Sequence, residues 1–136
     1  TPGISDPGYY LINNCIQNNI LVVPVPGANA AISALVCSGL PTDKFVFYGF
    51  LPKKEKAKET VFKLLKEQQK TVIFYESPHR IQKTLQMMNE IFPEKRLCIA
   101  RELTKKFEEF IRGTVSEVYE QCNNKELKGE IVLIIY

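Results

Sequence analysis

Apolar positions recur with helical spacing in several segments of the chain, and short apolar runs separate these segments. Repeats at i and i+4 predict a helix over residues 9–18, where Leu11 and Cys15 share one face. Similar patterns predict four further helices, of which Asn29 can cap the first. These helices cover residues 29–38, 55–68, 78–92 and 114–122. Apolar runs predict strands at residues 20–23, 45–50, 71–75, 97–100 and 130–136.

The alternation of strands and helices after residue 44 predicts a layered α/β fold with a parallel or mixed sheet. The signal Gly39-Leu40-Pro41 ends the second helix, and residues 41–44 form the best linker candidate. Residues 30–37 are apolar all round, which predicts that both sides of this helix are covered. On the helix at residues 55–68, the predicted buried face consists of Ala57, Val61, Leu64 and Leu65.

Composition excludes several classes of protein. The 136 residues are 45% hydrophobic and 24% charged, which is ordinary for a globular chain and excludes disorder as the main state. The four cysteines lie far apart without a CxxC pair, and there is one histidine, so we expect no metal site. No apolar run reaches membrane-spanning length and no signal peptide is visible, so we expect a cytoplasmic protein in a reducing compartment with no membrane association.

The net charge of +3 is mild, but its distribution is uneven. Residues 52–70 contain seven lysines and three glutamates. Such a run is typical of a solvated helix face, and it also suits a surface that contacts phosphate groups. The sequence leaves both interpretations open.

Charged residues follow directly on two predicted strands. Glu76 and Arg80 follow residues 71–75, while Arg101, Glu102 and Lys105 follow residues 97–100. Ligands of open α/β sheets bind beyond the carboxyl ends of the strands, so neighbouring strands would place these residues on one rim. Arg80 lies near the start of a helix, where a cation needs an anion; Glu76 could supply it in a structural ion pair, or an external phosphate could.

Two carboxylates on this rim, those of Glu76 and Glu102, are the candidates for a general base. The acidic pair Glu108 and Glu109 is expected to face solvent. The loop at residues 24–30 carries small side chains, so backbone there can approach a ligand closely. The dinucleotide fingerprint, the P-loop and the nucleophile elbow are all absent, so these residues predict a ligand-binding α/β fold without defining a reaction.

Seven short motifs in order carry a resemblance to a known family. The first resembles the loop Ala-Gly-Thr-Pro-Gly-Ile-Ser-Asp-Pro-Gly of the tetrapyrrole methylase superfamily, and the second resembles its other ligand loop. Together the seven look like the branch that methylates a cytidine 2′-hydroxyl of small-subunit ribosomal RNA. The motifs lie at residues 1–8, 25–30, 38–41, 49–52, 74–80, 101–105 and 128–130.

The resemblance implies S-adenosylmethionine as the methyl donor, bound between two α/β lobes, and a homodimer that acts on small-subunit ribosomal RNA. Residues 1–40 would be the end of the first lobe, and residues 41–136 would be a second lobe with a mixed sheet flanked by helices. Arg80, Arg101 and Lys105 would contact RNA. The cofactor contacts carried over from the family are Thr1, Pro2, Gly3, Asn29, Ala30, Glu76, Leu103 and Glu130.

Two other functions remain possible at this stage: a tetrapyrrole methylase of the same fold, and a non-catalytic RNA-binding module. The first residue is Thr1, inside the first motif, so we expect a fragment that lacks most of the first lobe. Such a fragment should be inactive and should bind the cofactor weakly or not at all on its own.

Overall fold

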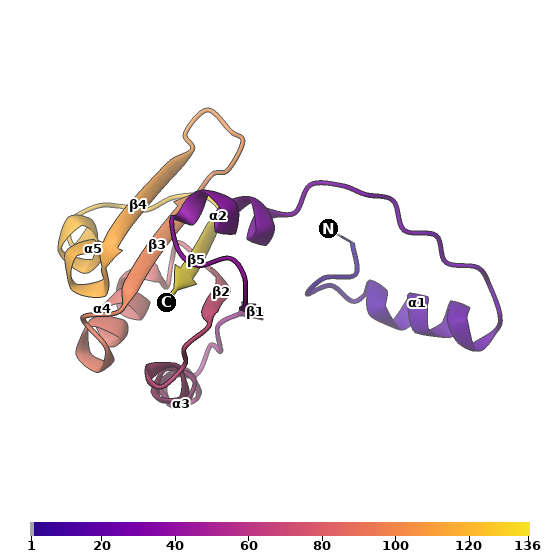
Figure 1. The fold of residues 1–136 in the computed structure, drawn as a ribbon, viewed down its shortest axis with the longest axis horizontal. Coiled ribbons are helices and arrows are strands. Elements are labelled where there is room, and N and C mark those ends of the chain that lie inside the picture. Colours follow the sequence, from indigo (N-terminus) through magenta and orange to yellow (C-terminus); the bar gives the residue numbers. More distant parts are fainter. Residues whose placement is uncertain (1) are drawn as a thin grey trace.

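The computed structural model describes residues 2–136, which form five helices and five strands (Figure 1). The helices are α1 (Gly8–Gln17), α2 (Ala30–Ser38), α3 (Glu55–Lys66), α4 (Ile81–Ile91) and α5 (Val115–Cys122). The strands are β1 (Phe45–Phe50), β2 (Thr71–Glu76), β3 (Arg96–Arg101), β4 (Glu109–Thr114) and β5 (Ile131–Ile135).

The strands form one mixed sheet in the order β1-β2-β5-β3-β4. β1 and β2 are parallel, and the other neighbours are antiparallel. The last strand of the chain therefore takes the central place, between β2 and β3. All five residues of β5 are buried, because the sheet is covered on both faces there.

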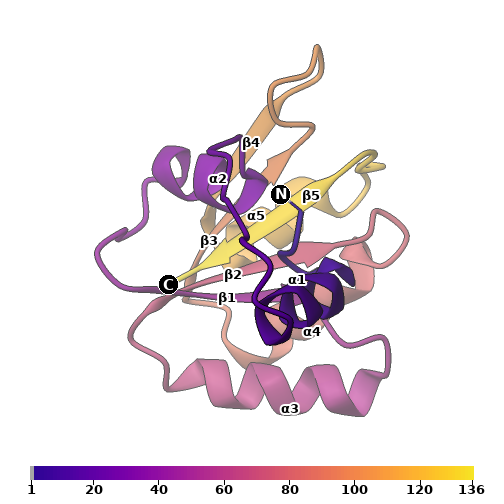
Figure 2. The same ribbon diagram turned by 90° about the vertical axis from the view of Figure 1, so that its right-hand side faces the viewer.

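The two faces of the sheet have separate cores. Leu133 points toward α3, α4 and α5, where its neighbours include Phe62 and Leu85. Ile134 points the other way, toward α2 and Ala34. This alternation follows from the two-residue period of a strand. Figures 1 and 2 show α2 on the opposite side of the sheet from α3, α4 and α5.

Local signals define the helix ends. The Asn29 side chain accepts a hydrogen bond from the Ile32 amide at 3.0 Å, and Gly39 ends α2 with a left-handed φ of 76°. Thr114 and Glu117 form a reciprocal capping box at the start of α5. These caps lie where the sequence predicts helix boundaries.

Residues 2–29 stand away from the layered body, and α1 has no buried residue (Figure 1). Their first turn reaches β1, since a Cβ on Gly49 would lie 2.5 Å from the Ser5 hydroxyl oxygen. The predicted strand at residues 20–23 is wrong: this segment is extended and exposed, and no strand among the described residues pairs with it.

Three other expectations need correction. β4 is a strand that the sequence did not predict, because its single buried side chain, Ile111, leaves a weak alternating pattern. The buried face of α3 consists of Lys58, Phe62 and Leu65, whereas Leu64 is exposed. The outer face of α2 is also open, because Val36 is exposed.

The mixed sheet and its flanking helices confirm the predicted α/β class. Residues 2–40 contribute no strand, while α2 packs on the sheet built from residues 45–135. A lobe boundary near residues 41–44 stays a prediction. In residues 2–136, no helix is both long and apolar enough to cross a membrane, and no cluster of His, Cys, Asp or Glu could hold a metal ion.

Candidate functional site

One edge of the sheet gathers the chemistry-bearing residues. The strand register pairs Glu76 with Ile131 and Ile131 with Arg101, and Arg101 in turn with Glu109. The premise that β2 and β3 are neighbours is wrong, because β5 lies between them. Both strands nevertheless run in the same direction, so their carboxyl ends meet at one edge, which we call the pocket edge.

A pocket of about 370 Å³ opens at the pocket edge. Its wall combines the ends of β1 and β2, the start of β5 and the first residue of α2. Most of the wall is apolar, with a few polar groups, which is typical of small-molecule sites. The lining residues are Ala30, Phe50, Tyr75, Glu76, Ser77, Pro78, Gly129, Glu130, Ile131 and Val132.

Glu76 holds one corner of this pocket through a buried polar network. Its Oε2 accepts hydrogen bonds from Thr84 Oγ1 at 2.7 Å and from Lys58 Nζ at 3.4 Å. Its Oε1 accepts from Arg80 Nη2 at 2.6 Å and from the Ser77 amide at 2.7 Å. The side chain of Glu76 has no exposed surface. Each carboxylate oxygen is therefore engaged within the protein.

The same network extends to neighbouring elements. Lys58 Nζ donates to Thr84 Oγ1 at 2.6 Å, which links α3 to α4. Arg80 Nη1 donates to the Leu51 carbonyl at 3.3 Å, which ties the residue after β1 to the start of α4. The Glu76–Arg80 ion pair is one of the two alternatives that the sequence left open. It also fixes the backbone of the pocket wall.

Tyr75 contributes an aromatic wall next to Glu76. Its ring packs edge-to-face against Phe47 and Phe50, with centroids 5.0 and 5.5 Å away. Burial raises the pKa of Tyr75. The backbone of Ala31 lowers this pKa to a smaller extent, and the negative charge of Glu130 raises it slightly further. The phenol thus stays neutral and acts as a packing and hydrogen-bonding group.

The β3–β4 hairpin forms the other side of the pocket edge and projects beyond the sheet (Figure 2). Glu102 Oε1 accepts from the Glu130 amide and from Lys105 Nζ, both at 3.0 Å, and Lys105 Nζ also lies 2.9 Å from Glu130 Oε2. Gly129 has a φ of 86°, and the Glu102 carboxylate occupies the space that a Cβ there would need. The cluster joins the hairpin to the start of β5.

Arg101 braces the base of the hairpin. It donates to the Lys128 carbonyl at 3.0 Å, to the Phe107 carbonyl at 3.2 Å and to Glu109 Oε2 at 3.1 Å. Glu109 also pairs with Lys125. The expectation that Glu108 and Glu109 both face solvent is therefore wrong for Glu109, which is half-buried and ion-paired.

Glu102 makes the hairpin sensitive to acid. The Glu130 amide and then the Lys105 ammonium lower the pKa of Glu102, and Lys125 and Arg101 lower the pKa of Glu109. A lowered folded-state pKa gives stability that is present above the ordinary value and lost as the pH falls through the folded value. We expect an NMR titration of the Glu102 carboxyl carbon to show a midpoint below about 4.3, the usual glutamate value.

The same titration on the Glu102→Gln chain supplies the control. The Glu130 amide, which donates to the Glu102 carboxylate, should then show a much smaller change in this acid range. A Glu102 midpoint at or above the usual glutamate value would contradict the contacts described for this cluster.

The predicted site residues differ in how they relate to the pocket. Ala30, Glu76 and Glu130 line it, and Asn29 caps the helix that begins at Ala30. Leu103 packs against the core beneath α2. Pro2 and Gly3 belong to the N-terminal turn and do not line the pocket, and Thr1 lies outside the described residues.

Sequence reasoning missed several wall residues, among them Phe50, Tyr75 and Val132. Phe50 and Tyr75 each end a predicted strand, which could have indicated them. Val132 carried no such signal, because only the placement of β5 brings it to the pocket. The three predicted RNA-contacting cations, Arg80, Arg101 and Lys105, each have a carboxylate partner in the fold.

A comparison of the sequence with known protein families agrees with this fold. The sequence profile of the tetrapyrrole (corrin/porphyrin) methylases matches residues 1–119. The chain therefore belongs to that family.

Particular relatives narrow the comparison. The chain is 47% identical over 134 residues to ribosomal RNA small subunit methyltransferase I of Bacillus subtilis (strain 168), a match that covers 98% of this chain and 46% of that protein. It is 45% identical over 136 residues to the protein of the same name from Synechocystis sp., covering 99% and 49%. The chain thus spans about half the length of these relatives.

Solved structures share the fold at low sequence identity. The methyltransferase CobJ superposes with a TM-score of 0.68 at 16% identity, covering 98% of this chain and 60% of that one. A uroporphyrin-III C-methyltransferase from Thermus thermophilus, solved in complex with S-adenosylhomocysteine, gives a TM-score of 0.58 at 14% identity, covering 94% and 58%.

Proposed function

We propose that this chain comprises the end of the first lobe, residues 1–40, and the second lobe, residues 41–136, of an S-adenosylmethionine-dependent methyltransferase that 2′-O-methylates a cytidine ribose in small-subunit ribosomal RNA. The observation that carries the proposal is the pocket at the carboxyl ends of β1 and β2, most of whose lining residues fall in the motifs shared with that family. The names of the relatives at 45–47% identity support the choice of RNA as substrate.

The pocket suits the cofactor chemically. Its volume of about 370 Å³ and its apolar wall fit part of an adenosyl group. The small side chain of Ala30 leaves the backbone accessible, and the exposed carboxylate of Glu130 offers a partner for a cationic group. We assign cofactor contacts to Ala30, Glu76 and Glu130 in the pocket wall, and extend this proposal to Thr1, Pro2, Gly3, Asn29 and Leu103.

When bound, the cofactor supplies a methyl group that its sulfonium charge has already activated. The protein then has to hold the ribose hydroxyl in line with that methyl group, so positioning provides most of the rate. Of the two candidate bases, Glu76 has both oxygens engaged and no exposed side-chain surface. Glu102 is the more accessible carboxylate, but its lowered pKa makes it a weak proton acceptor.

RNA contacts are proposed for Arg80, Arg101 and Lys105 at the pocket edge. We further propose that the whole protein is a homodimer in the cytoplasm.

A tetrapyrrole substrate is not favoured, because the relatives at high identity are named for ribosomal RNA, and the likeness to tetrapyrrole enzymes at 14–16% identity concerns the fold. A purely RNA-binding role does not account for the pocket at the ends of β1 and β2.

The test uses the whole protein with methyl-labelled S-adenosylmethionine, offered either small-subunit ribosomal RNA or uroporphyrinogen III. We expect label on a cytidine ribose and none on the tetrapyrrole. Calorimetry on the 136-residue chain alone should show weak cofactor binding or none, because the chain covers about half of the relatives' length. Methylation of the tetrapyrrole alone, or no transfer to RNA, would overturn the proposal.

A further inference from the structure

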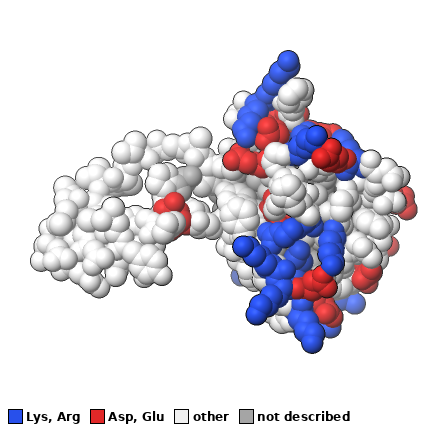
Figure 3. Space-filling view, turned by 180° about the vertical axis from the view of Figure 1, so that it is seen from behind, with Lys and Arg blue, Asp and Glu red and all other residues white. Residues whose placement is uncertain are grey.

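A group of uncompensated positive charges near the pocket lies on the turn between β1 and α3 and in the first turn of α3. Lys53, Lys54 and Lys56 are exposed, and none of them forms an ion pair with any residue from 2 to 136. Their neighbour Glu55 pairs with Lys83 instead. Figure 3 shows Lys and Arg side chains gathered at the end of the body where α3 lies. We call these three residues the lysine turn.

The lysine turn is held in place beside the pocket. Phe50 lines the pocket, and the next residue, Leu51, is buried. The Leu51 amide donates to the Tyr75 carbonyl at 3.4 Å, and its carbonyl accepts from Arg80. Three neighbouring like charges repel one another, so the fold gains no stability from them. A polyanion that reaches the pocket would gain electrostatic attraction from all three lysines.

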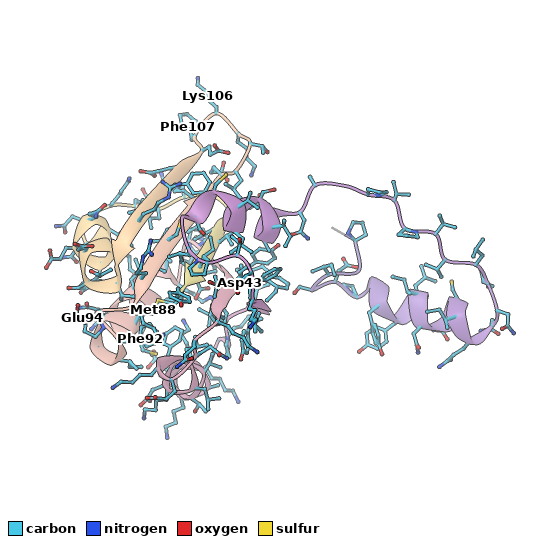
Figure 4. All side chains as sticks on the ribbon, viewed as in Figure 1. Asp43, Met88, Phe92, Glu94, Lys106 and Phe107 are labelled. Atoms are coloured by element: carbon cyan, nitrogen blue, oxygen red, sulfur yellow. The ribbon has the colours of Figure 1, made fainter. Side chains whose placement is uncertain are left out.

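A second exposed feature stands at the tip of the β3–β4 hairpin, on the same edge of the sheet (Figure 4). Phe107 is 65% exposed, and Lys106 Nζ lies 5.6 Å from the centre of its ring. Arg101 holds the Phe107 carbonyl at 3.2 Å, and Glu108 accepts from the Thr104 amide at 2.6 Å. The aromatic ring is thus presented to solvent on a braced loop.

We propose that single-stranded RNA lies along the pocket edge, with its phosphates on Lys53, Lys54 and Lys56 and an unpaired base stacked on Phe107. Basic side chains that follow a backbone, combined with an aromatic platform, form the usual surface for unpaired nucleic acid. This docking rests on the proposed function, because the pocket lies between the two features. It gives the main phosphate contacts to the lysine turn, since Arg80, Arg101 and Lys105 are already paired.

The salt dependence of binding tests the lysine turn. The whole protein is titrated with fluorescently labelled small-subunit ribosomal RNA at several salt concentrations. The Lys53→Ala/Lys54→Ala/Lys56→Ala variant should bind more weakly and lose about two units of salt slope, at roughly 0.7 per phosphate for single strands. The matched control removes Lys44, Lys66 and Lys70, which are exposed, lack ion pairs in the described chain and lie toward the opposite edge.

The stacking role of Phe107 is tested by affinity at constant salt slope, separately from the lysine turn. Phe107→Ala should weaken binding about tenfold with an unchanged salt slope, because base stacking is not a phosphate contact. Phe107→Tyr should keep the affinity near that of the original protein. A Phe107→Ala variant that binds RNA normally and changes its oligomeric state would overturn the stacking role in favour of a protein contact.

The outcomes separate the docking surface from the proposed function. Equal losses in the lysine-turn variant and its control, or no loss in either, overturn the docking surface, while the original protein still methylates RNA. Failure of the original protein to bind or methylate the RNA overturns the proposed function instead. Normal cofactor affinity in every variant, measured by calorimetry, shows that the pocket itself is intact.

Discussion

The Glu76→Gln chain should be less stable than the original by about 3–5 kcal/mol. The substitution removes the negative charge between Lys58 and Arg80, and Lys58 is only 4% exposed. The Lys58 ammonium group then stays buried, with only the Thr84 hydroxyl and the new side-chain amide at position 76 as partners. Breaking a buried ion pair from one side is costly, because the remaining charge cannot reach water without opening the packing between α3 and α4.

Urea denaturation followed by circular dichroism measures this loss. Glu59→Gln is the matched control on α3: its partner Lys63 is exposed, so the expected change is at most about 0.5 kcal/mol. A Lys58→Met/Glu76→Gln double variant should recover part of the stability, because it removes the stranded charge. A loss below about 1 kcal/mol for Glu76→Gln would show that the network contributes little.

The Ala30→Trp substitution should reduce the affinity of the whole protein for S-adenosylmethionine by at least about a hundredfold, equivalent to about 2.7 kcal/mol. Ala30 lies in the pocket wall at the first position of α2, so an indole there occupies much of a pocket of about 370 Å³. The residue is exposed, so the core beneath α2 stays intact. The reduction is therefore in binding and not in folding.

Calorimetry with the cofactor and a thermal melt of the same samples separate the two effects. Ala57→Trp is the matched control, since it makes the same change at an exposed helical position outside the pocket. The control should bind the cofactor normally. If Ala30→Trp also bound it normally, the cofactor site would have to lie elsewhere.

Local sequence signals determined most of the elements and the family. The caps at Asn29 and Thr114 and the stop at Gly39 lie where residue chemistry places them, because caps depend on neighbouring residues only. The apolar runs of β1, β2, β3 and β5 are strands, as predicted. The ordered motifs predicted the family that the profile match confirms.

The tertiary structure decided which strands pair and which charges are compensated. The insertion of β5 between β2 and β3 brings Val132 into the pocket, and no local pattern encodes it, because strand pairing joins residues far apart in the chain. The partners of Glu76 show the same dependence. The lysines of residues 52–70 are indistinguishable by local sequence, but Lys58 is buried beside Thr84 and is structural, whereas Lys53 and Lys54 are exposed.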